Sequence, residues 1–136
     1  MISRTHNRHN DRGAVAVELA LVLVILLPLV FGIIQFGMFF NQKQGVHAAA
    51  REGARLASLP TSTSAQVQSR VRDALGDVAG INPLTASITI SPASCVNHTG
   101  ETITVTVNAG DFDFAIPFVP GLGSQARTGT GKFRCE

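Results

Sequence analysis

Residues 19–34 read LALVLVILLPLVFGII, sixteen consecutive positions without a polar side chain. With two polar interruptions, the apolar tract extends over residues 14–40, which as a helix would be roughly 40 Å long. That length exceeds the ~30 Å hydrocarbon core of a bilayer. A helix that is apolar on every face is typical of a membrane span and not of a buried helix in a soluble domain. We therefore predict a membrane-spanning helix, with the span at about residues 19–40.

Charge is distributed unevenly over the 136 residues. Residues 13–42 contain one of the chain's 20 Lys, Arg, Asp and Glu side chains, Glu18, and the other 106 residues contain 19 of them. The charged fraction of these 106 residues, about 18%, is closer to that of ordinary soluble proteins. The composition therefore predicts a water-soluble body attached to a membrane segment, and the length leaves no room for a two-domain enzyme with a cofactor fold.

A cleaved secretory signal peptide is the first alternative for the N-terminal region, because Arg4, Arg8 and Arg12 resemble a basic n-region. The apolar stretch is longer than the ~7–15 residues of such signals. The nearest A-x-A pattern, at residues 48–50, follows a polar stretch and does not directly follow the apolar one. A membrane anchor is therefore the favoured interpretation.

The orientation of this anchor depends on the cysteines, because positive charge is nearly balanced between its two flanks. The chain has two cysteines, Cys95 and Cys135, both in its C-terminal part. A lone pair in a small exported domain more often forms a disulfide than a metal site. We therefore predict a Cys95–Cys135 disulfide, a cytoplasmic N-terminus and an exported C-terminal part.

Glu18 is the unusual residue of the span, since a carboxylate in an apolar helix is costly and usually has a partner or a task. It lies five positions after Gly13 in the string RGAVAVEL, residues 12–19. This arrangement resembles the processing site of type IV pilin-like precursors. The resemblance implies that a prepilin peptidase cuts between Gly13 and Ala14, and that the Glu18 carboxylate pairs with the N-terminal amine of a neighbouring subunit. An acid that snorkels to the membrane interface is the alternative.

A second resemblance lies in residues 31–37, FGIIQFG, and residues 48–55, AAAREGAR. Both are similar to the signature of TadE-like proteins, the minor pilins of tight-adherence (Tad/Flp) pili. Leu19 stands where the major Flp pilins carry tyrosine, which favours a minor, pseudopilin-type protein, and Gln35 stands where family members usually carry glutamate. The resemblance implies a bacterial cell-membrane protein whose partners are the prepilin peptidase, other pilins, the Tad assembly platform and the lipid bilayer.

The residues after the apolar tract predict a small α+β head. No breaker other than tolerated glycines lies between Asn41 and Leu59, so the first helix is predicted over residues 14–59. An apolar face beginning at Val67 predicts a second helix that ends near residues 76–80. Alternation in residues 86–91 and 102–107, with a Gly-rich stretch at about 125–135, predicts a short antiparallel sheet. The predicted organisation is a basic leader at 1–13, the long helix, and an exported head at 60–136.

Four small residues recur at intervals of four in the C-terminal part of the first helix: Gly45, Ala49, Gly53 and Ala57. This spacing places them on one helical face, where small side chains permit close approach of a second helix. The stripe could pack against the head of its own chain or against another subunit, and the sequence leaves both alternatives open.

The remaining residues do not assemble into a catalytic or metal-binding pattern. Cys95 and His98 form a single C-x-x-H pair without the second pair that a zinc site needs. A net charge of +2 is too small and too scattered to favour nucleic-acid binding. We predict a minor pilin that is not an enzyme and takes no cofactor, metal or small-molecule substrate. The alternative is an unprocessed, single-pass, membrane-anchored scaffold or binding domain.

Overall fold

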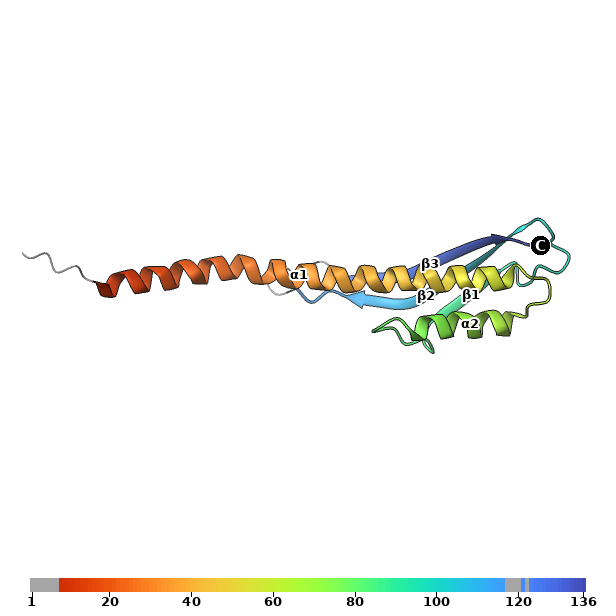
Figure 1. Ribbon diagram of the computed structural model, residues 1–136, viewed down its shortest axis with the longest axis horizontal. Helices are drawn as coiled ribbons and strands as arrows, with labels where there is room; N and C mark the ends of the chain where they lie inside the picture. Colours follow the sequence, from red (N-terminus) through yellow and green to blue (C-terminus); the bar gives the residue numbers. More distant parts are fainter. Residues whose placement is uncertain (1–7, 117–120, 122) are drawn as a thin grey trace, which may run out of the picture.

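The computed structural model describes residues 8–116, 121 and 123–136, and its elements are arranged along one long axis (Figure 1). Their bounds are α1 Arg8–Ala57, α2 Ser64–Gly76, β1 Ser87–Ser91, β2 Thr102–Asp113 and β3 Ser124–Arg134. The strands form one antiparallel sheet in the order β1-β2-β3. The predicted α+β class, with a long N-terminal helix, a second helix and a short antiparallel sheet, is confirmed.

Helix α1 has two halves with different surroundings. Its N-terminal half extends alone, whereas α2 and the sheet lie along its C-terminal half (Figure 1). Among residues 13–57 of α1, the first buried side chain is Phe39, and buried positions then recur every three or four residues through Gln42, Val46 and Ala49 to Ala57. This spacing keeps one face of the helix turned toward the head. The head therefore covers α1 in a stripe, while the N-terminal half keeps apolar side chains exposed on all faces.

The core of the head lies between the sheet and the two helices. Helix α2 begins with a capping box, in which Thr63 and Gln66 exchange side-chain and backbone hydrogen bonds of 2.9 and 3.3 Å. The apolar face of α2 and alternate residues of β2 meet the small and branched residues of α1. The fully buried larger side chains of this core are Val46, Val67, Val71, Leu75, Ile103, Val105 and Val107.

Strand β2 is longer than its sequence pattern predicts. The alternation predicts a strand at residues 102–107, whereas β2 continues to Asp113. The pairing with β3 shifts between Asn108 and Asp111, and Gly110 there has a φ of 77° and donates its N–H to the Asn108 side chain at 2.9 Å. The shift is a β-bulge, which interrupts the alternation that a sequence reading depends on and bends the strand without ending it.

Two glycines of strand β3 allow the backbone of this strand to pack directly against the backbone of α1. A Cβ atom added at Gly129 would lie 2.7 Å from backbone atoms of Val46 and His47, and one at Gly131 would lie 2.6 Å from the carbonyl carbon of Ala50. Both glycines are buried. The Gly-rich composition of this strand is therefore a packing requirement, because any side chain facing α1 at these positions would push the helix away.

Replacing Gly131 by alanine should lower the free energy of unfolding of the head by about 1–3 kcal/mol, because the added methyl group overpacks a contact made by backbone. Gly76→Ala is the matched control: Gly76 is helical, and a Cβ there meets nothing within 4 Å. This substitution should raise the stability by up to about 1 kcal/mol. Denaturant unfolding in detergent, followed by circular dichroism, measures both. Equal stability of the two variants would contradict the close packing of β3 on α1.

Candidate functional site

The exposed N-terminal half of α1 is the most conspicuous surface of the molecule. From Gly13 onward α1 is long and apolar enough to cross a membrane, and none of its most apolar window is buried. The core helix of a soluble protein would be covered by the rest of its chain, and this segment is not. The exposed apolar side chains therefore indicate a membrane anchor, because so large a continuous apolar surface is unfavourable in water.

The predicted processing bond between Gly13 and Ala14 lies inside α1, because the helix begins at Arg8. Residues 8–13 of the predicted leader are therefore part of the helix, and residues 1–7 lie outside the described part of the chain. Gly13 is exposed, and a Cβ added there would meet nothing within 4 Å. Glycine is also a weak helix former, costing about 1 kcal/mol relative to alanine, so the backbone at this bond is accessible and comparatively easy to unwind.

Glu18 lies one helical turn beyond Ala14 and on the same face, since the two residues are four positions apart. The Glu18 side chain is exposed. It makes no hydrogen bond or ion pair with any residue in the described part of the chain. The rise of α1 separates the Ala14 and Glu18 Cα atoms by roughly 6 Å along the helix axis. A chain displaced by about one turn could therefore bring its N-terminal amine to this carboxylate.

The small-residue stripe packs within the head. A Cβ added at Gly45 would lie 2.5 Å from a methyl group of Val78, and one at Gly53 would collide with Val71 of α2. Ala49 and Ala57 are also buried. Of the two alternatives that the sequence leaves open, the structure shows packing of the stripe against α2 and the residues that follow it in the same chain.

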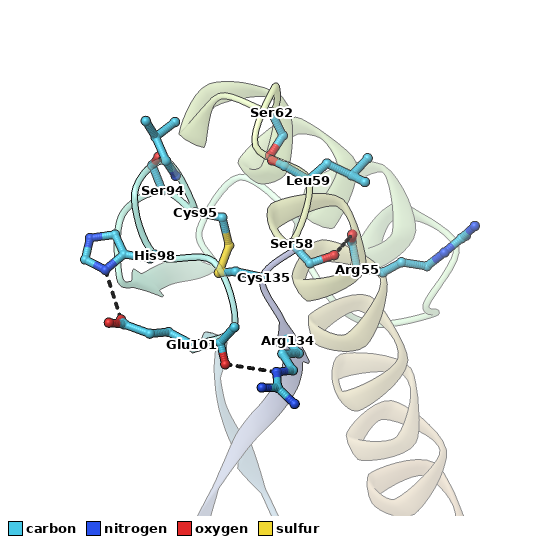
Figure 2. The surroundings of a disulfide bond; sticks show 12 residues. Arg55, Ser58, Leu59, Ser62, Ser94, Cys95, His98, Glu101, Arg134 and Cys135 are labelled. Atoms are coloured by element: carbon cyan, nitrogen blue, oxygen red, sulfur yellow. Dashed lines mark hydrogen bonds and ion pairs between the residues drawn. A yellow bond between two sulfur atoms is a disulfide. The ribbon is translucent and has the colours of Figure 1, made fainter.

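Cys95 and Cys135 form a disulfide with a Cα–Cα distance of 5.4 Å, beside the C-terminal end of α1 (Figure 2). The bond joins the loop that follows β1 to the residue that follows β3. The same region is held by backbone hydrogen bonds, from the Cys135 N–H to the Glu101 carbonyl at 2.8 Å and from the Gly100 N–H to the Cys135 carbonyl at 3.0 Å. The covalent link therefore closes the end of the head that is farthest from the apolar anchor.

An ion pair joins the two helices at the surface of the head. The Arg70 guanidinium of α2 donates two hydrogen bonds, of 2.8 and 3.2 Å, to one carboxylate oxygen of Glu52 in α1. These bonds lower the pKa of Glu52, and the nearby positive charge of Arg55 adds to the effect. Both partners are solvent-exposed enough that the pair contributes modestly to stability. Its geometry indicates a role in fixing α2 on α1.

Gln35 has no role that the sequence predicts, yet its amide makes a two-point contact with a segment 80 residues away. The Gln35 Nε2 atom donates to the Ala115 carbonyl, and the Ala115 N–H donates to Gln35 Oε1, both at 2.8 Å. The side chain therefore satisfies both polar groups of one peptide residue, as a paired strand would. A glutamate here could accept from the N–H but, when ionised, could not donate to the carbonyl.

Beside Gln35, five aromatic side chains form what we call the phenylalanine cluster: Phe36, Phe39 and Phe40 of α1, Phe112 of β2, and Phe114. Ring centroids of Phe36 and Phe114 are 4.9 Å apart, and those of Phe39 and Phe112 are 5.7 Å apart. The sequence carried a signal, because seven of the chain's eight phenylalanines lie in residues 31–40 and 112–118. Their meeting could not be read from either stretch alone.

Other polar groups offer little chemistry within residues 8–116, 121 and 123–136. No group of three or more His, Cys, Asp or Glu side chains there could hold a metal ion. The His98 ring and the Glu101 carboxylate share a hydrogen bond of 2.9 Å at the surface, close to the disulfide (Figure 2). Its two partners lie three residues apart in one turn, which is typical of local loop structure.

The long N-terminal helix has an exposed apolar half, which is a candidate membrane anchor, and a small antiparallel sheet packs on its other half (Figure 1). Residues 13–55 match the family model described as TadE-like protein. This segment of the chain is therefore TadE-like, in agreement with the resemblance drawn from its motifs, and the family indicates a protein associated with the Tad pilus. No match was found among the curated proteins or among the solved structures.

The family match begins at Gly13 and ends at Arg55. It therefore includes the bond predicted to be cut, Glu18, Gln35 and the first three residues of the small-residue stripe. Helix α2, the sheet and the disulfide lie outside the matched residues. The matched residues thus all lie within α1.

Proposed function

We propose that this chain is a minor pilin of a tight-adherence pilus, cut after Gly13 and used in pilus assembly. The single observation that supports the proposal best is the exposed apolar half of α1, which begins at the TadE-like glycine and contains one acid, Glu18. In this proposal the N-terminus is cytoplasmic, α1 crosses the cell membrane once, and the head is exported. The partners are the prepilin peptidase, other pilins and the Tad assembly platform.

The proposed role depends on surfaces and not on catalysis. Removal of residues 1–13 would create an ammonium group at Ala14 close to an apolar environment, where an unpaired charge is unfavourable. The carboxylate of Glu18 on an adjacent chain is a partner of opposite charge, and attraction between the two is stronger in low dielectric than in water. Assembly would then satisfy two charges that each separate chain leaves without a protein partner.

The first test is the N-terminal residue of the protein purified from cells with and without the prepilin peptidase. We expect Ala14 at the N-terminus when the peptidase is present and the uncut chain when it is absent. Edman sequencing or intact-mass measurement distinguishes the two. An uncut chain in cells that contain active peptidase would overturn the processing step and favour the alternative of an unprocessed, membrane-anchored scaffold.

A matched pair of substitutions sharpens this test. Gly13→Leu should block the cut, because a bulky side chain then flanks the scissile bond. Gly37→Leu places the same side chain elsewhere on α1 and should leave the cut unaffected. A Cβ at either position meets nothing within 4 Å, so neither change should disturb the fold. Normal cutting of Gly13→Leu would show that the peptidase does not recognise this position.

A further inference from the structure

The exposed part of α1 has nearly the length of a bilayer core. From Gly13 to Phe31 the helix has almost no contact with the head, and these nineteen residues rise roughly 28 Å. The hydrocarbon core is about 30 Å thick. Phe39 is buried against the head, close to residue 40, where the sequence predicts the end of the span. A span that begins at Gly13 would therefore place the head-side border of the bilayer core near residues 32–35.

Residues 114–116, which directly follow β2 and which we call the hairpin end, return to α1 at this same level. Ile116 approaches Gly32, with its Cδ1 atom 3.7 Å from the position of a glycine Cβ. Three residues farther along α1, Gln35 binds both backbone polar groups of Ala115. These contacts fix the hairpin end beside the helix and satisfy backbone groups that would be costly to leave unpaired at the edge of a membrane.

The phenylalanine cluster lies next along α1, on the side of the head, and the protein covers it only partly. Phe39 is buried, but Phe36 is 38% and Phe40 is 55% exposed. The ammonium of Lys43 lies 5.6 Å from the centre of the Phe39 ring, on the head side of the cluster. Asp111 and Asp113 are exposed on the opposite face of β2 from the cluster. Along α1, the apolar helix comes first, then the aromatic side chains, and then the cation of Lys43. This is the order expected across a membrane interface, from the hydrocarbon core through the headgroup region to water.

We propose that the phenylalanine cluster and Ile116 form an interfacial foot, which rests in the headgroup region of the bilayer that α1 crosses. The foot continues the apolar surface of α1 without a gap, and the hairpin end brings further aromatic surface to the same depth. The head is then held at the membrane by two segments, α1 and the hairpin end, and sits directly on the bilayer. The foot requires only that α1 crosses a membrane, so it is independent of cutting at Gly13 and of pilus assembly.

The sequence offers a direct probe, because the chain contains no tryptophan and no tyrosine. Phe114→Trp in the full-length chain gives a single fluorophore in the foot. The protein is reconstituted in phosphatidylcholine vesicles and titrated with lipids brominated near the headgroup, and separately with aqueous iodide. Phe133→Trp is the control: Phe133 is partly exposed beside Arg55 and Leu56. That position is roughly 30 Å along α1 from Gln35.

We expect the indole of the Phe114→Trp variant to emit at shorter wavelength than that of the Phe133→Trp control. The brominated lipids should quench the first fluorophore, and iodide should quench the second. Equal behaviour of the two variants would overturn the proposal, since the head would then stand clear of the bilayer. Protection of the Phe114→Trp fluorophore from both quenchers would also overturn it, because protein and not lipid would then cover the cluster. Ile116→Trp repeats the measurement at the half-exposed hairpin end if Phe114→Trp does not retain the wild-type circular dichroism.

Discussion

Glu18→Ala should leave cutting after Gly13 intact and abolish the contribution of this chain to pilus assembly. The substitution removes the only ionisable side chain between residues 13 and 42. The N-terminal amine of the cut chain would then enter the apolar interior of the assembly without a partner, and an unpaired buried charge is strongly unfavourable. Electron microscopy of surface pili, together with the N-terminal sequence of the membrane-bound chain, measures both parts of the prediction.

Two further variants test whether assembly depends on the charge of Glu18 or only on the size of a side chain in this part of α1. Glu18→Gln keeps the size and hydrogen-bonding capacity of the side chain but not its charge, and should also fail to assemble. Leu19→Ala truncates an exposed side chain one position away, and should be cut and assembled normally. Normal piliation with Glu18→Ala would rule out the assembly role of this carboxylate. It would not affect the conclusion on cutting after Gly13, which is measured separately.

Replacing Cys95 and Cys135 together by alanine should lower the free energy of unfolding of the head by about 3–4 kcal/mol. The disulfide closes a loop of 40 residues, and on the chain-entropy model a loop of this size restricts the unfolded chain by that amount. The head depends on it because its core is small and its first strand, β1, has only five residues. Alanine is preferred to serine, since both cysteines are buried and a hydroxyl there would lack a partner.

Reduction provides the internal control for this prediction. The wild-type head should lose the same stability in dithiothreitol that the double variant loses by substitution, and the double variant should not respond to the reductant. Denaturant unfolding with and without dithiothreitol gives both comparisons. Equal midpoints for oxidised and reduced wild-type protein would show that the bond contributes little to the folded state.

The elements of this fold were largely predictable because their signals are local. The apolar run at residues 19–34 is sufficient for a helix, since the composition of about twenty residues decides membrane partitioning. The alternation around Ile103, Val105 and Val107 likewise predicts a strand with one buried face. What the alternation missed was the continuation of β2 from Asn108 to Asp113, because a bulge between these residues removes the period of two on which that prediction relies.

The candidate sites divide in a similar way. Gly13, Ala14 and Glu18 are predicted from a resemblance to the processing site of type IV pilin-like precursors, and the structure shows them on an exposed part of α1. Their roles in cutting and assembly stay predictions until they are measured. Gln35 stands out in the sequence only for departing from the family pattern, and its contact with Ala115 joins residues 80 positions apart. No local pattern at either end encodes that pairing.

The sequence by itself predicted an apolar anchor helix, a candidate cutting site through its family resemblance, and the segments that form helices and strands, apart from the last residues of β2. Each of these properties depends on residues close together along the chain. Only the tertiary structure showed that the small-residue stripe packs against α2. It also showed that the glycines of β3 allow close contact with the backbone of α1, and that the hairpin end contacts α1. These depend on which distant surfaces meet, and that choice is made by packing of the whole head and not by the composition of any one segment.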